Sequence, residues 1–328
     1  MKVAIYGAGA IGALLGARLS EAGWEVSLIA RGAHLSAIRN SGLRIVSDEF
    51  GDNTYQLEST DDPATIGPVD YLILGVKAHA LTAIAPRVAP LVKESTTFVS
   101  TQNGLPWWYF HAAEGVDARL ESVDPGGVIA QHMPPEQCIG SVVYMSCHVI
   151  EPGVVRHTHG IRLPLGEPDG TATERVKALA EAFRAGGIQA PVRNSVQQEL
   201  WMKLFGNAIF NPLSALTRKT LVEMTEFPPT REIILRAMAE VSETALAVGV
   251  RIGVTPDKRL EGARQAGFHK PSMLQDLESG RSSELDSLTG AAIELAHRHH
   301  VPVPCLEAVY AAAKLLFEPS RSPGGTAD

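Results

Sequence analysis

Residues 3–12 read VAIYGAGAIG, a short apolar run followed by three glycines with G-x-G-x-x-G spacing. A helical pattern continues through Leu15, Leu19 and Ala22, and a second strand is expected over residues 25–30. Strand, glycine-rich turn, helix and strand make up the βαβ unit of a dinucleotide-binding fold. The sequence therefore predicts a Rossmann-type domain, and the alternative is a glycine-rich turn in some other α/β protein.

Each glycine of this motif has its own predicted role. Gly7 permits the tight turn, Gly9 lets a pyrophosphate approach the backbone, and Gly12 lets helix and strand pack closely. The N-terminus of the helix, formed by Gly9, Ala10, Ile11 and Gly12, is then expected to hold the phosphates of the cofactor.

The second strand is followed by Arg31, where an NAD-binding domain would carry Asp or Glu for the ribose 2'-hydroxyl. The guanidinium group of an Arg suits a 2'-phosphate instead. NADP(H) is therefore the favoured cofactor, and the alternative for Arg31 is a solvated surface charge.

Two more strands continue the predicted sheet. The apolar run 69–76 ends at Lys77, and the strand 97–100 leads into Thr101-Gln102-Asn103-Gly104. Lys77 and Asn103 thus follow the carboxyl ends of strands, where open α/β sheets bind their ligands. Asn103-Gly104 is ordinary turn chemistry by default, and the alternative, after a Rossmann strand, is that it aims the Asn103 amide at the nicotinamide.

The pattern then changes along the chain. Residues 138–164 are β-rich, with segments 141–150 and 154–157, and predict the antiparallel half of a mixed sheet. A helix over 173–185 and a last strand over 187–192 are expected to complete this part.

Helical patterns follow at 195–213, 230–248 and 284–300, while strand patterns nearly vanish. The length of 328 residues also favours two domains. We predict a dinucleotide-binding domain over 1–193, an all-helical substrate and catalytic domain over 194–328, and a frayed tail over 319–328.

Residues 200–213 read LWMKLFGNAIFNPL and predict a helix that is apolar nearly all round and therefore buried. Lys203, Asn207 and Asn211 are spaced i, i+4, i+8 and form one polar stripe on it. The stripe is either a snorkelling Lys beside two core amides, or a catalytic Lys with two substrate-orienting amides. Pro212 removes a helix hydrogen bond and opens the backbone beside the stripe.

A second candidate site lies at the start of the helix 284–300. Glu284 falls within the apolar arc of this helix, whereas Asp286 points away from it. Glu284 is either a catalytic or substrate-binding carboxylate or a compensator of the helix dipole. Ser272 fits both a capping box and a substrate hydroxyl contact.

Composition narrows the classes of partner. The net charge is −7 and no segment accumulates Lys and Arg, so nucleic acid is not expected to bind. His157 and His159 lack a third ligand nearby, so no metal is expected. Three scattered cysteines, the absence of a leader pattern and the lack of an apolar stretch long enough for a bilayer indicate a cytoplasmic protein away from membranes.

Taken together, these motifs resemble the ketopantoate reductase (2-dehydropantoate 2-reductase) family along nearly the whole chain. The resemblance rests on the following residues: Gly7, Gly9, Gly12, Arg31, Lys77, Thr101 to Gly104, Trp201 to Asn211, Ser272 to Asp276 and Glu284 to Asp286. It implies a Rossmann domain followed by an all-helical domain related to that of 6-phosphogluconate dehydrogenase, with the active site between them. It also implies NADPH-dependent reduction of ketopantoate to pantoate, on the route to pantothenate and coenzyme A.

The resemblance assigns a role to each matching residue. Arg31 and Lys77 would contact the 2'-phosphate end of the cofactor, and Asn103 would lie near nicotinamide and substrate. Lys203 would be the general acid. The remaining contacts to the small 2-oxo acid substrate would come from Asn207, Asn211, Ser272 and Glu284, with Glu284 binding its hydroxyl group.

Three departures from the family pattern concern the substrate pocket. Thr289-Gly290 stands where Asn-Gly is common, Leu221-Val222 is apolar, and Trp107 opens an aromatic segment in a stretch, 107–127, whose role the sequence leaves open. Two alternatives therefore remain: an NAD(P)-dependent enzyme for another 2-oxo or 2-hydroxy acid, and a nucleotide sensor without catalysis. The sequence does not determine the quaternary state, and a homodimer is one option.

Overall fold

The structure is a computed structural model that describes residues 1–111 and 119–318. It divides into two compact units, Met1–Leu200 and Trp201–Asp328. The tail predicted over 319–328 and the central part of the stretch 107–127 lie outside the described residues.

The first unit is built on a seven-stranded sheet with the order β11-β8-β7-β6-β1-β2-β5. Its strands from β8 to β5 in this order run parallel, and β11 pairs antiparallel with β8. The bounds are β1 Lys2–Tyr6, β2 Glu25–Ile29, β5 Glu58–Thr60, β6 Tyr71–Leu74, β7 Thr97–Ser100, β8 Cys138–Ser141 and β11 Leu165–Gly166.

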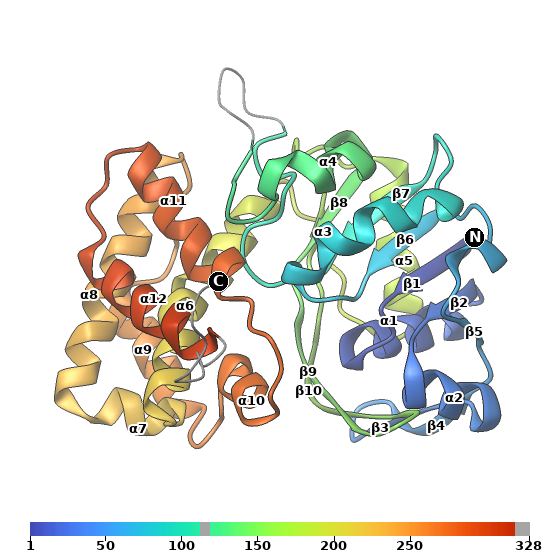
Figure 1. Cartoon of the computed structure of the whole chain (residues 1–328), viewed down its shortest axis with the longest axis horizontal. Coiled ribbons are helices and arrows are strands. Elements are labelled where there is room, and N and C mark those ends of the chain that lie inside the picture. The colour runs from blue at the N-terminus through green and yellow to red at the C-terminus, as the bar shows by residue number, and fades with distance from the viewer. Residues whose placement is uncertain (112–118, 319–328) are drawn as a thin grey trace, which may run out of the picture. The chain divides into compact units, whose positions relative to one another are not determined.

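Continuous apolar runs place the central strands in the interior, with both faces of the sheet covered. The chain moves from β1 to β2 in one direction and from β6 to β7 in the other. Because such crossovers are right-handed, α1 (Ala10–Glu21) covers one face, and α3 (Leu81–Ile84) covers the other. In Figure 1, α3 and α4 (Val128–His132) lie side by side, whereas α1 packs with α5 (Glu174–Ala185). This arrangement confirms the Rossmann-type prediction.

A second, four-stranded sheet has the order β4-β3-β10-β9. The strands are β3 Leu43–Ser47, β4 Gly51–Tyr55, β9 Tyr144–Glu151 and β10 Val154–Arg162, and α2 (Gly32–Ser41) precedes β3. The prediction that 138–164 is the antiparallel half of a mixed sheet is confirmed for β9 and β10, which pair antiparallel in a sheet where β10 also pairs parallel with β3. The prediction was wrong for β8. Only β8 joins the main sheet, and it does so in parallel, while β9 and β10 bury apolar side chains in the cluster that α1 and α5 share.

The strand predicted over 187–192 is also absent from the described structure as a regular element. Gln189 and Val192 form isolated bridges to Arg162 and Leu165. Pro191 lies between them and has no N–H to donate, so the ladder is interrupted.

All regular elements in the described residues of the second unit are helices, as predicted. Its elements are α6 Val196–Thr217, which begins in the first unit, α7 Leu221–Glu226, α8 Pro228–Ala247, α9 Pro256–Gln265, α10 Ser272–Glu278, a π-helical turn Asp286–Gly290, α11 Ala291–Arg298 and α12 Pro304–Phe317. The helix predicted over 284–300 thus begins with one widened turn.

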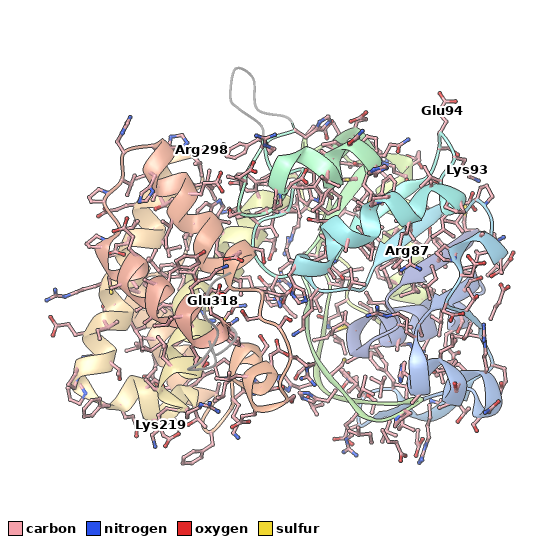
Figure 2. All side chains as sticks on the ribbon, viewed as in Figure 1. Arg87, Lys93, Glu94, Lys219, Arg298 and Glu318 are labelled. Carbon is pink, nitrogen blue, oxygen red and sulfur yellow. The ribbon has the colours of Figure 1, made fainter. Side chains whose placement is uncertain are left out.

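Charged side chains of both signs point outward from the two units. Arg87, Lys93 and Glu94 of the first unit and Lys219 of the second are exposed (Figure 2). In the part of the chain that the structure describes, no helix combines the length and apolarity needed to cross a membrane.

Candidate active site

The glycine-rich turn after β1 is tightly packed at two positions and open at the third. Gly7 has a φ of +97°, and a Cβ on it would lie 2.6 Å from Cγ1 of Val76. A Cβ on Gly12 would lie 2.2 Å from the carbonyl oxygen of Gly7, so this glycine lets α1 meet the strand. A Cβ on Gly9, by contrast, would meet nothing within 4 Å.

The open position lies at the start of α1. Gly9 is the N-cap, and Ala10 and Ile11 follow in the first turn. Gly9 has no side chain with which to cap the helix, and the N–H groups of a first turn have no partner within the helix. An anionic group such as a pyrophosphate fits this position because of the helix dipole and the absent side chain.

Gly75 is a further glycine of this site that sequence reading missed. A Cβ there would lie 2.4 Å from the carbonyl oxygen of Gly7 and 3.0 Å from Cα of Gly12. The end of β6 thus runs directly against the turn. A lone glycine after a buried strand was the available signal.

Arg31 is exposed and forms the N-cap of α2, directly after β2. Its charge and that of Arg87 act on Tyr6 at the end of β1: burial raises the pKa of the Tyr6 hydroxyl, and the two guanidinium groups oppose this rise. Arg87 is thus a second cation near the carboxyl end of β1. Sequence reading did not single it out, because it lies in a short irregular helical segment.

Lys77 and Asn103 follow the neighbouring strands β6 and β7. Thr101 ties the two loops together, since its hydroxyl donates to the carbonyl oxygen of Leu74 over 2.6 Å. The amide of Gln102 donates to the same oxygen over 2.7 Å and to that of Val76 over 2.8 Å. The strands β7, β6, β1 and β2 are parallel neighbours. The predicted cofactor residues, which follow these strands, therefore all lie at the carboxyl end of the sheet.

In the second unit, α6 carries the predicted polar stripe. The apolar side chains that share one face of this helix are at most 1% exposed: Trp201, Leu204, Phe205, Ala208 and Ile209. Lys203 and Asn207 are half-buried, and Asn211 is buried. The helix is therefore buried on nearly all sides, as its sequence predicts.

Lys203 has a perturbed ammonium group. Burial lowers its pKa from 10.5 to about 8, and the negative charge of Glu284 partly opposes this shift. Although part of the Lys203 side chain is exposed, burial dominates at the titrating end. The structure thus brings Lys203 and Glu284 within electrostatic reach of each other, and it gives the Lys a pKa suited to proton transfer near neutral pH.

Asn211 contains an unsatisfied polar group. Only 4% of the residue is exposed, and within the described residues its Nδ2 has no hydrogen-bond partner. A buried amide without a partner costs free energy, and such groups call for an explanation. A site for a polar ligand that accepts a hydrogen bond from Nδ2 is one explanation for this group.

Thr289, one of the three departures from the family pattern, holds α6 in place. Pro212 has no N–H, so the carbonyl oxygen of Ala208 lacks its helical donor. The hydroxyl of Thr289 donates to this oxygen over 2.8 Å. The π-helical turn that follows Glu284 is therefore hydrogen-bonded to the backbone of α6 between Asn207 and Asn211 of the polar stripe.

The other two departures are the aromatic segment that begins at Trp107 and the apolar pair Leu221-Val222. Trp107 and Trp108 are 4% and 0% exposed, and their indole N–H groups donate to the carbonyl oxygen of Met133 and to Oγ of Ser100. Both are therefore core residues of the first unit. The backbone N–H groups of Leu221 and Val222 donate to the carbonyl oxygens of His269 and Gly267.

Ser272 does not cap its helix. It is the first residue of α10, exposed, and preceded by Pro271 at the N-cap, so the capping-box interpretation was wrong. Its hydroxyl stays a predicted substrate contact. Asp276, on the same helix, is buried and accepts from Nε of Arg281 over 3.1 Å.

His157, one of the two histidines on β10, has a structural explanation. Nδ1 of His157 lies 2.8 Å from Oγ of Ser47, and Nε2 lies 2.7 Å from the carbonyl oxygen of Gly160. Over residues 1–111 and 119–318, no group of three or more His, Cys, Asp or Glu side chains is arranged to hold a metal ion.

Comparison with known proteins places these features in a family. The family model for ketopantoate reductase PanE/ApbA matches residues 3–170, and the model for its C-terminal part matches 195–317. The 2-dehydropantoate 2-reductase of Mesorhizobium japonicum is 44% identical over 96% of this chain and 98% of its own.

Solved structures agree with these matches. The 2-dehydropantoate 2-reductase of Geobacter metallireducens superposes with a TM-score of 0.85 at 28% identity, covering 96% of this chain and 99% of the other. The dimeric ketopantoate reductase of Staphylococcus aureus shares the fold with a TM-score of 0.73 at 19% identity, covering 97% and 99%. One family model spans the glycine-rich turn, the other spans the polar stripe, and the Mesorhizobium relative is 44% identical over 96% of this chain; this chain therefore belongs to the ketopantoate reductase family.

Proposed function

We propose that this protein reduces ketopantoate to pantoate with NADPH. Within the family assignment, the observation that carries the proposal is Lys203, an ammonium group of lowered pKa that lies on a buried helix near the carboxylate of Glu284. A protein that only senses nucleotides has no use for such a pair in its second unit.

Residues 1–193 would form the NADP-binding part. Gly9, Ala10, Ile11 and Gly12 would hold the pyrophosphate at the start of α1, with Gly7 shaping the turn. Arg31 and Lys77 would contact the 2'-phosphate end, and Asn103 the nicotinamide. When bound, the cofactor supplies the hydride for the carbonyl carbon.

Residues 194–328 would form the substrate and catalytic part. As hydride reaches the carbonyl carbon, negative charge develops on the carbonyl oxygen, and Nζ of Lys203 would stabilise it and then donate its proton there. The neutral amine regains a proton from solvent. With a pKa of about 8, most Lys203 side chains are protonated at neutral pH and give up the proton more readily than an ordinary Lys.

The polar groups around Lys203 would orient the substrate. Asn207, Asn211 and Ser272 would hydrogen-bond to the 2-oxo acid, which would satisfy the unpartnered Nδ2 of Asn211. Glu284 would accept the hydrogen bond of the substrate hydroxyl, a charge-assisted contact that favours ketopantoate over 2-oxo acids that lack this group.

The proposal extends to assembly and location. A homodimer is proposed because the Staphylococcus aureus reductase of the same fold is dimeric. The cytoplasm is proposed because Cys138, Cys147 and Cys305 form no disulfide among the described residues and would persist as thiols there.

A substrate panel tests the proposal. The purified protein is mixed with NADPH and, in turn, ketopantoate, 2-oxoisovalerate, pyruvate and phenylglyoxylate, and NADPH absorbance is followed. Ketopantoate should give the highest kcat/KM. A higher kcat/KM for another acid would identify that acid as the substrate, and the reaction would still be the reduction of a 2-oxo acid. NADPH binding without turnover of any acid would favour a nucleotide sensor.

A further inference from the structure

His34 lies in the first turn of α2, three residues after Arg31, and both nitrogens of its ring are engaged. Nε2 lies 2.8 Å from the carbonyl oxygen of Ala8, in the glycine-rich turn. Nδ1 accepts a hydrogen bond of 3.0 Å from the backbone N–H of Gly153, in the turn between β9 and β10. One side chain thus joins three segments that are distant in the sequence.

The partner at Nδ1 determines the tautomer of His34. The N–H of Gly153 can only donate, so Nδ1 is unprotonated, and the neutral ring carries its hydrogen on Nε2. Nε2 therefore donates to Ala8, whose carbonyl oxygen can only accept.

The position of Gly153 is fixed by a hydrogen bond and by close packing. Its carbonyl oxygen accepts from the backbone N–H of Arg44 over 2.9 Å. Its φ is +81°, and a Cβ would lie 2.9 Å from Cβ of Ala37 on α2. The second sheet thus presents a fixed donor to His34.

The bond to Ala8 fixes the direction of the next N–H group. The Ala8–Gly9 peptide is planar and trans, so its C=O and N–H point in opposite directions. The N–H of Ala8 is also held, by the carbonyl oxygen of Ile29 over 2.9 Å, and Ala8 is only 2% exposed. With Ala8 held on both sides, the Gly9 N–H has one direction, away from the imidazole.

We propose that His34 is a positioning residue for the cofactor: through Ala8 it orients the Gly9 N–H for the pyrophosphate, and it couples this turn to the helix that carries Arg31. The inference rests on the proposed use of NADP(H). It assigns His34 no contact with the cofactor, because both ring nitrogens already have protein partners.

Two substitutions separate the two bonds of the ring. In His34→Gln, the amide nitrogen can take the place of Nε2 and donate to Ala8, while the acceptor for Gly153 is lost. In His34→Asn, the shorter side chain offers an oxygen near the Nδ1 position for Gly153 but does not reach Ala8. His34→Ala removes both bonds and takes the place of His34→Asn if that variant does not fold.

Two ligands separate positioning from general loosening. NADPH contains the pyrophosphate, whereas 2'-AMP has the 2'-phosphate and the adenosine but no pyrophosphate. Dissociation constants are measured by calorimetry on the full chain, with thermal unfolding of the ligand-free variants alongside. His34→Asn should raise the Kd for NADPH about five- to tenfold, the size expected for one hydrogen bond. Its Kd for 2'-AMP should stay within about twofold of the parent, and His34→Gln should bind both ligands nearly as the parent does.

The contrary results are equally clear. If His34→Asn weakens the binding of NADPH and of 2'-AMP equally, His34 stabilises the fold in general and does not position the turn. If its Kd for NADPH is unchanged, His34 has no role in cofactor binding. Either result leaves the proposed reaction standing if the parent binds NADPH. A parent that does not bind NADPH would overturn the proposed cofactor and this role together. Nitrogen NMR of the parent imidazole should find Nδ1 unprotonated, and the opposite tautomer would overturn the mechanism.

Discussion

The hydroxyl of Thr289 donates a 2.8 Å hydrogen bond to the carbonyl oxygen of Ala208, which Pro212 leaves without a helical donor. Both residues are completely buried. The contact fastens the turn that follows Glu284 to the helix that carries Lys203. A residue that departs from the common family pattern thus satisfies a backbone group beside the proposed catalytic pair.

Thr289→Val should lower the free energy of unfolding by about 1 to 3 kcal/mol, because a buried carbonyl oxygen loses its donor while the side-chain shape is kept. Thr244→Val is the matched control. Thr244 is also fully buried, but its hydroxyl donates to the Glu240 carbonyl oxygen, which keeps its helical N–H donor. Urea unfolding of both variants measures the difference, and equal losses would contradict the assignment.

Arg31→Ala should erase most of the preference for NADPH over NADH. A charge-assisted contact to the 2'-phosphate is worth roughly 1.5 to 3 kcal/mol, or about ten- to a hundredfold in affinity. Arg39→Ala, on the same helix and near Asp61, is the control and should bind both cofactors as the parent does. If Arg31→Ala discriminates as well as the parent, the phosphate is read elsewhere, and Arg87 becomes the next residue to replace.

Lys203→Ala should slow ketopantoate reduction by about a hundred- to ten-thousandfold while NADPH still binds. Lys219→Ala, at an exposed position that pairs with Glu223, should leave the rate unchanged. A Lys203→Ala variant that stays within a few-fold of the parent would make the lysine structural.

The rate should also depend on pH through Lys203. The general acid must be protonated, and its pKa is lowered to about 8, so kcat should be level below about pH 7 and fall as pH rises through about 8. Lys203→Arg remains protonated across this range, so its residual rate should lose the fall. A parent profile that is flat to about pH 10 would exclude Lys203 as the proton donor.

Glu284→Gln should weaken ketopantoate binding by roughly tenfold or more, since the neutral amide forfeits a charge-assisted hydrogen bond to the substrate hydroxyl. For 2-oxoisovalerate, which lacks the hydroxyl, the variant should resemble the parent. Kinetics with both substrates provide the measurement. Equal penalties for the two would remove Glu284 from hydroxyl recognition.

Asp286→Asn is the matched control for this prediction. Asp286 lies two residues further along, and it accepts from the hydroxyl of Tyr310 and the ammonium of Lys314 over 2.7 Å each. Its substitution should reduce stability and leave the ratio of the two substrates unchanged.

Local sequence patterns were sufficient to predict the Rossmann core and the burial of α6. Their residues carry the signal themselves, as continuous apolar runs, spaced glycines and one polar stripe. The pairing of β9 and β10 with β3 and β4 in a separate sheet was not predicted, because β10 pairs with β3, more than a hundred residues earlier, and because β4, with the sequence GDNTY, has no apolar alternation. Pairing at such distances leaves no periodic trace in one sequence.

Other parts of the candidate site depend on backbone partners, which a sequence does not display. His34 was overlooked because it bonds to the main chain of Ala8 and Gly153. Thr289 looked like a departure, although Pro212 had already indicated a freed carbonyl oxygen in α6. The sequence does not show which distant hydroxyl donates to that oxygen.

Trp108 and Gly140 are complementary in size, and the residues at these two positions should change together in related sequences. A Cβ on Gly140 would lie 2.5 Å from the edge of the fully buried Trp108 ring, so the indole occupies the volume that a side chain on β8 would otherwise fill. Neither residue can change size alone without a clash or a cavity. Relatives that carry a smaller residue in place of Trp108 are therefore expected to carry a larger one in place of Gly140, and the two positions should covary across the family.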